Sequence, residues 1–232
     1  MDAQRALGVR RLHSLSGVVP LGVFLVEHLW ATSGAIRGRV VFDARVIWLD
    51  HLRVGTLFEI VFILVPLLFH AGYGVVLAFE KKDDPDRYPY ADRHFRFLLR
   101  ASGLLSLVFI AWHVWELPLQ RLLAKIPAAD LFDLLSLHLA TTVSGVPWRA
   151  IGYFLGLFLT VFHFSYGMVS FVYSERQVRD PQQLRRWAFR FGALGAILFV
   201  IGGATILSLA SGWPSGGAPP VLPPVVCPHP AS

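Results

Sequence analysis

The chain has 232 residues, of which 55% are hydrophobic and 16% charged, and its net charge is +6. Soluble domains carry about 25% charged residues, so this composition excludes an ordinary water-soluble fold and a disordered chain. The single cysteine excludes an internal disulfide and zinc sites built on paired cysteines, and basic residues alone give no reason to expect a nucleic-acid partner.

Five apolar stretches are long enough to cross a membrane, because a transmembrane helix needs about 20 mostly apolar residues. In chain order they cover roughly 12–33, 56–79, 98–118, 148–173 and 188–210. Between the third and fourth, the stretch DLFDLLSLHL is apolar-periodic but too short to span, which predicts a helix on the membrane surface. We therefore predict an all-α bundle of five transmembrane helices over 1–210, followed by a flexible Pro/Gly-rich tail over 211–232. No internal repeat stands out.

The distribution of Lys and Arg predicts the orientation of the bundle. These residues are about twice as frequent in the N-terminal segment and in the second and fourth connections as in the others. The positive-inside rule then places the N-terminus in the cytoplasm and the C-terminus outside.

Four histidines lie deep inside the apolar stretches, each on a different one: His28, His70, His113 and His163. An ionisable side chain at membrane depth is costly and marks a functional site. At 1.5 Å per residue, His28 and His113 lie about 24 and 22 Å from the cytoplasmic starts of their spans, near the outer face. His70 and His163 lie about 21 and 22 Å from the outer starts of theirs, near the cytoplasm. The depths therefore predict an outer pair and an inner pair.

Two imidazole pairs across a helical bundle suit two six-coordinate b-type haems, each with two axial histidines. Small residues on the same helix faces would leave room for a porphyrin, namely Gly17, Gly74, Ser102 and Gly167. Two alternatives remain open. The histidines could only hydrogen-bond neighbouring helices, or they could line a metal or haem transporter, which should also carry carboxylates or thiols along its path. Glu27 and Glu59 are the main acidic residues in or near the spans.

Four segments carry a resemblance to a known family: RRLHSLSGVVPLGVFLVEHL (10–29), LVPLLFHAGYGV (64–75), WHVWE (112–116) and VFHFSYGMVSF (161–171). Together they resemble the cytochrome b subunit of succinate dehydrogenases, of the single-chain, five-helix, two-haem type. The resemblance is close over the first four spans, rests on hydropathy alone in the fifth, and does not cover the tail.

The resemblance implies a multi-pass anchor in the cytoplasmic (inner) membrane for two peripheral subunits, a flavoprotein with FAD and an iron–sulfur protein. Electrons would pass from the iron–sulfur subunit through the inner haem and then the outer haem to a quinone, usually menaquinone. It also assigns the axial ligands to His28, His70, His113 and His163, in agreement with the pairing by depth.

Direction is left open by the resemblance, because related quinol:fumarate reductases share this type of anchor. Many of those carry a glutamate two residues before the fourth ligand, and Val161 occupies that position here. The difference favours succinate oxidation.

Further site residues follow from charge and position. His13, Ser14 and Arg100 are candidates for holding haem propionates near the cytoplasmic level, with Arg10, Arg96 and Arg176 as alternatives. A quinone near the outer haem needs a group that exchanges protons, and we favour Asp50 and Glu59 at the entrance of the second span. Other outer candidates are Asp43, His51 and Glu116. His94 and His138 are interpreted as interfacial residues without partners.

Overall fold

The structure, a computed structural model, describes residues 3–52, 56–80, 93–174, 178 and 180–212. Within these ranges the chain forms helices and no strand, apart from an isolated bridge between Val143 and Val146. The predicted all-α fold class is confirmed. Of the predicted tail, residues 213–232 lie outside the described ranges, and so does Arg176.

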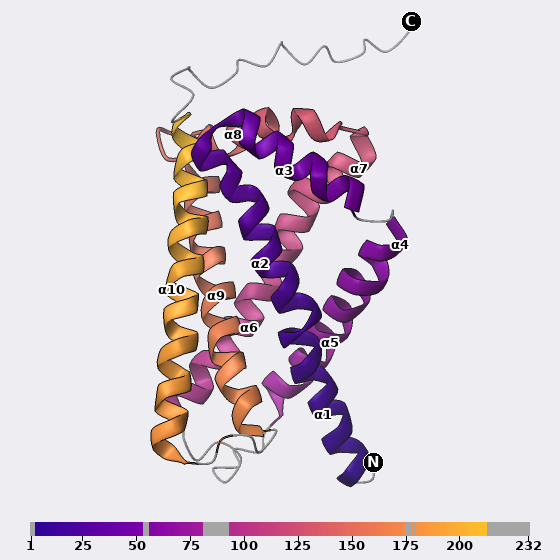
Figure 1. Ribbon diagram of the computed structural model, residues 1–232, viewed down its shortest axis with the longest axis vertical. Coiled ribbons are helices and arrows are strands. Elements are labelled where there is room, and N and C mark those ends of the chain that lie inside the picture. The colour runs from indigo at the N-terminus through magenta and orange to yellow at the C-terminus, as the bar shows by residue number, and fades with distance from the viewer. Residues whose placement is uncertain (1–2, 53–55, 81–92, 175–177, 179, 213–232) are drawn as a thin grey trace, which may run out of the picture.

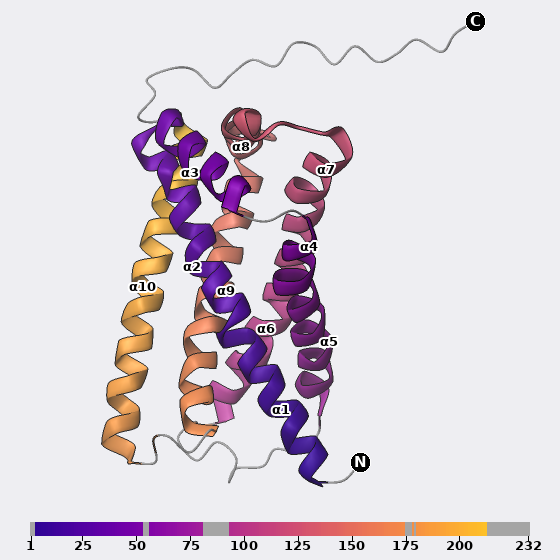
Figure 2. The ribbon, with the colours of Figure 1, turned by 45° about the vertical axis from the view of Figure 1, so that its right-hand side comes forward.

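In the described part of the chain, five helical segments are long and apolar enough to cross a membrane, as predicted. They form a bundle that runs from a lower end, where the chain begins, to an upper end (Figures 1 and 2). The crossings are α1 (Ala3–Val18) with α2 (Pro20–Thr32), α4 (Thr56–Glu59) with the π-helical turn η2 (Ile60–Leu64) and α5 (Val65–Phe79), α6 (Arg93–Val114) with the π-helical turn η4 (Trp115–Leu119) and α7 (Gln120–Ala124), α9 (Trp148–Ser174), and α10 (Pro181–Ser211).

Three crossings extend beyond their predicted ends. The first begins at Ala3 rather than near residue 12. The third continues through Pro118 to Ala124, because the wider π-helical turn accommodates a residue that has no N–H to donate. The fifth begins at Pro181, about two turns earlier than predicted. There the Asp180 side chain accepts hydrogen bonds from the backbone N–H groups of Gln182 and Gln183, which caps the helix.

Shorter helices cover the upper end of the bundle: η1 (Ser33–Arg37), α3 (Arg39–Leu52), η5 (Ala128–Asp130) and α8 (Leu131–Ala140) (Figure 1). The helix predicted from DLFDLLSLHL is confirmed as α8, whereas α3 was not predicted. Arg39 joins the two, since its Nη1 lies 2.7 Å from an Asp133 carboxylate oxygen. That hydrogen bond raises the pKa of Arg39, while burial raises the pKa of Asp43.

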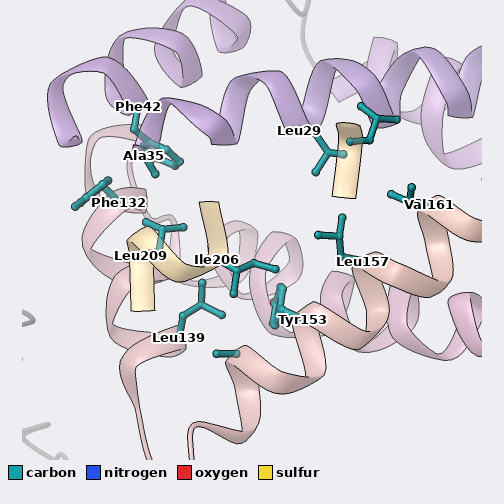
Figure 3. Close-up of a cluster of buried hydrophobic side chains, with 12 residues drawn as sticks. Leu29, Ala35, Phe42, Phe132, Leu139, Tyr153, Leu157, Val161, Ile206 and Leu209 are labelled. Carbon is teal, nitrogen blue, oxygen red and sulfur yellow. The ribbon is translucent and has the colours of Figure 1, made fainter. Parts of the chain in front are cut away.

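The main core lies where α9 and α10 pack against α2, η1 and α8. Figure 3 shows Leu29, Leu157 and Ile206 among the side chains that meet there. α10 packs along α9, and α6 packs on α9 as well. α5, by contrast, has no fully buried residue, which suits a helix at the edge of the bundle with one side against its neighbours and the other open to lipid. The four deep histidines lie on α2, α5, α6 and α9, so the core positions three of these helices directly or through a neighbour.

Candidate functional site

The four deep histidines meet in two pairs, each bridging two helices. In the upper pair, the rings of His28 on α2 and His113 on α6 have centres 5.9 Å apart and planes at 74°. In the lower pair, His70 on α5 and His163 on α9 have centres 6.2 Å apart and planes at 75°. The structure therefore brings together the same partners that the depth calculation paired.

The spacing within each pair fits two ligands on opposite sides of one metal. Metal–imidazole bonds are about 2 Å long, so two rings facing each other across an iron have centres about 6 Å apart. A group of three or more His, Cys, Asp or Glu side chains able to hold a bare ion does not occur among the described residues. Two ligands per level match the two axial positions of a haem iron, whose other four ligands come from the porphyrin.

Both histidines of the lower pair are held by backbone carbonyls of a neighbouring helix. His70 Nδ1 lies 3.0 Å from the carbonyl oxygen of His13, and His163 Nδ1 lies 3.2 Å from that of Leu99. A carbonyl can only accept, so each Nδ1 carries the proton and donates it. Each Nε2 is then unprotonated, which is the form of imidazole that ligates a metal.

The two carbonyls belong to matching segments of α1 and α6. Ser16 Oγ donates to the His13 carbonyl at 2.8 Å, and Ser102 Oγ donates to the Leu99 carbonyl at 3.0 Å. A glycine follows each serine and lets the imidazole approach the helix. A Cβ on Gly17 would overlap the His70 ring, and a Cβ on Gly103 would lie 2.8 Å from His163 Cε1.

The two helices that carry the lower pair, α5 and α9, also resemble each other in sequence. The expectation that the chain has no internal repeat was therefore wrong. Residues 69–76 of α5 read FHAGYGVV and residues 162–169 of α9 read FHFSYGMV, sharing the pattern F-H-x-x-Y-G-x-V. α1 packs on α5, and α6 packs on α9. The lower site is thus built from two copies of one helix pair, and the repeated pattern was the signal that would have revealed it.

His13 is the third imidazole at the lower level. Its ring stacks on that of His70, with centres 4.2 Å apart and planes at 9°, and its Cε1 lies 3.3 Å from the Cβ position of Gly74. The space beside Gly74 is therefore filled by His13, whereas nothing described lies within 4 Å of the Cβ position of Gly167. Of the glycines predicted to leave room for a porphyrin, Gly17 meets the His70 ring and Gly74 meets His13, so the space beside Gly167 is the one that remains open among the described residues.

The remaining propionate candidates lie on α1 and α6 near the lower end. Ser14 and Arg100 are half-buried. Arg10, one of the alternatives, forms an ion pair with Glu80, whose Oε1 lies 2.6 Å from Arg10 Nη2. Its charge is therefore already paired with a carboxylate of the protein. The ion pair links the start of the first crossing to the end of the second.

His113 of the upper pair is held by side chains. His113 Nδ1 lies 3.3 Å from the hydroxyl of Tyr153 on α9, and that hydroxyl donates to Glu116 Oε2 at 3.2 Å. Glu116 also accepts from Arg149 Nε at 2.6 Å. His138 Nδ1 lies 3.8 Å from Glu116 Oε1, which is beyond hydrogen-bond distance, and it has no hydrogen-bond partner among the described residues. Burial lowers the pKa of His138, against the attraction of Glu116.

The favoured quinone candidates lie at the upper end, where α3 ends and the second crossing begins. Asp50 on α3 is exposed and lies 3.5 Å from Arg121 Nη2 on α7. Glu59 is the last residue of α4 and is half-buried. Of the other candidates, His51 is exposed and Asp43 lies 3.4 Å from Arg39.

Comparison with known proteins gives one strong relation. The chain is 37% identical over 185 residues to the succinate dehydrogenase cytochrome b558 subunit of Bacillus subtilis (strain 168), covering 80% of this chain and 88% of that protein. No protein-family profile matches the chain. No solved structure matches it.

Proposed function

The chain belongs to the family of succinate dehydrogenase cytochrome b subunits, and from this premise we propose that it binds two b-type haems. His28 and His113 hold the upper haem, and His70 and His163 hold the lower one. The observation that carries the proposal is the pair of ring separations, 5.9 and 6.2 Å, each close to the span of two imidazoles across one iron. The hydrogen bonds at Nδ1 of His70 and His163 support it, because they leave Nε2 available.

As the membrane subunit of a succinate dehydrogenase, the protein anchors a flavoprotein subunit and an iron–sulfur subunit. The lower end faces the cytoplasm, in keeping with the bias of Lys and Arg, and receives the iron–sulfur subunit. When bound, the two haems supply one-electron redox chemistry at two levels of the membrane, between that subunit and a quinone, with menaquinone as the expected acceptor.

The polypeptide contributes side chains that bind the haem propionates and side chains that transfer protons to the quinone. His13, Ser14 and Arg100 bind the propionates of the lower haem, since their donor groups suit carboxylate acceptors. Asp50 and Glu59 lie near the upper end and deliver protons to the quinone during its reduction. The lipid-exposed α5 leaves a membrane-soluble quinone free to approach from the bilayer.

The reaction runs in the direction of succinate oxidation. Val161, which takes the place of a glutamate found in many fumarate reductases, is 4% exposed and packs in the core with Leu198. An apolar side chain in this position offers no proton path along α9, which favours succinate dehydrogenase over an anchor of quinol:fumarate reductase.

The haem content of the purified complex tests the proposal. Pyridine haemochrome quantification should give two b haems per chain, both reducible by dithionite and at least partly by succinate. No bound haem would overturn the proposal and leave a histidine-lined transporter or histidines that only pack the bundle. A single haem would refute one of the two sites.

A further inference from the structure

We propose that Tyr153 and Glu116 form a hydrogen-bonded relay that orients His113 and lowers the redox potential of the upper haem. The inference rests on the proposed function, since it takes His113 as an axial ligand. It assigns these residues a positioning role that neither the family membership nor the ligand set supplies.

The direction of each hydrogen bond in the relay follows from the groups themselves. Tyr153 has a single hydroxyl proton, and it donates this proton to the Glu116 carboxylate, which can only accept when ionised. The phenol oxygen must then accept from His113, so Nδ1 of His113 carries the proton. Nε2 of His113 is left unprotonated, as it is in both histidines of the lower pair.

The surrounding residues hold the relay rigidly. Tyr153 is 9% exposed and packs edge-on against Trp112 and Phe109, with ring centres 5.0 and 5.6 Å away. Glu116 is also 9% exposed and lies in the π-helical turn η4, whose altered pitch changes the direction of its side chain relative to His113 three residues earlier. Arg149 fixes one carboxylate oxygen and leaves the other for Tyr153.

The relay differs in charge from the anchors of the lower pair. His70 and His163 donate to neutral backbone carbonyls, whereas His113 donates to a phenol that is itself bonded to a carboxylate. A ligating histidine whose other nitrogen donates toward a carboxylate becomes a stronger electron donor, which stabilises the oxidised metal. Tyr153 and Glu116 therefore lower the potential of the upper haem relative to a site without them.

The test is a redox titration of the complete complex carrying Tyr153→Phe or Glu116→Gln. The upper component is identified as the spectral component missing from a His28→Leu complex. Tyr166→Phe is the matched control, because it removes one hydroxyl from the same helix at the level of the lower pair, where Tyr166 packs on Phe162.

Both test variants should keep two haems and make the upper component easier to reduce. For Tyr153→Phe we expect the ratio of reduced to oxidised upper haem at a fixed ambient potential to rise about tenfold, equal to about 59 mV for a one-electron couple. The lower component should be unchanged, and Tyr166→Phe should leave the upper one unchanged. Because the two residues act in series, the double variant should shift the ratio by less than the product of the single effects.

An unchanged upper potential in Tyr153→Phe with both haems bound would overturn the relay and leave the proposed function standing. If Tyr153→Phe loses the upper haem, Glu116→Gln decides, since it removes the charge and keeps the phenol; an unchanged potential or a lost haem there also overturns the relay. Fewer than two haems in the unmodified complex would instead refute the proposed function.

Discussion

The lower and upper histidine pairs use the same ligand type but are supported in different ways. The lower rings donate to the carbonyls of His13 and Leu99, each three residues before a Ser-Gly pair. In the upper pair, His113 bonds to Tyr153, and the chain of contacts continues through Glu116 to the end of the bundle.

The difference shows how two similar haem sites in one chain can acquire different properties. Backbone carbonyls hold an imidazole without adding charge, and a side-chain substitution does not remove the acceptor itself. A side-chain relay adds charge and connects the site to titratable groups at the surface. Outer partners of this kind are a principal means by which a protein adjusts a metal site whose direct ligands are the same.

Replacing the histidines themselves should have the largest effect and would break the comparison if the pairing is wrong. His28→Leu and His113→Leu should each remove the same spectral component, and His70→Leu and His163→Leu should each remove the other. Haem content should fall from two to one per chain in every case, measured by pyridine haemochrome and low-temperature spectra. Loss of the same component from His28→Leu and His70→Leu would contradict the two-level arrangement.

Adding a side chain at Gly17, against which the His70 ring packs, should affect the lower site alone. In Gly17→Ala the new methyl group overlaps the His70 ring, which must move away from the His13 carbonyl. Loss of such outer support typically costs about 10–100-fold in metal affinity, so the lower haem should be lost or bound weakly. Gly72→Ala is the control, since nothing described lies within 4 Å of its Cβ position. Equal haem loss in both variants would point to general destabilisation of the bundle.

The quinone chemistry should be confined to the upper end. Asp50→Asn and Glu59→Gln should lower succinate-dependent quinone reduction by about a hundredfold for whichever carboxylate delivers the protons. Both haems should stay bound and reducible by succinate, because neither residue is a proposed axial ligand. Unchanged turnover in both variants would remove these two candidates.

The smallest effect expected is a pH dependence of the protein's stability that arises from His138 at the upper end. Burial holds the pKa of His138 below its ordinary 6.5, with Glu116 opposing this shift and Arg149 adding to it. The unfolded chain therefore binds this proton more readily than the folded one. The contribution of His138 to the free energy of unfolding is then fully present above about pH 6.5 and is lost as the pH falls. Thermal unfolding of the complex from about pH 8 to about pH 5.5 should show a shallower decline in His138→Gln. An identical decline would exclude His138 as its source.

Several features of the fold could be predicted from the sequence. Runs of about 20 apolar residues identify membrane crossings, and a rise of 1.5 Å per residue converts a position in a run into a depth. These two facts placed His28 with His113 and His70 with His163. The same reasoning failed at Pro118 and Pro181, because apolar runs do not reveal a π-helical turn or the polar first turns of a capped helix.

Depth along a helix is determined by the sequence, but rotation about its axis and the choice of neighbour are determined by packing. Hydropathy therefore could not show that His13 stacks on His70, that Gly17 and Gly103 admit the lower rings, or that α9 brings Tyr153 between His113 and Glu116. These contacts join residues at least 37 positions apart, such as Tyr153 and Glu116, and form only when the helices pack. The sequence by itself determined the crossings and the level of each imidazole, and the tertiary structure decided what supports each one.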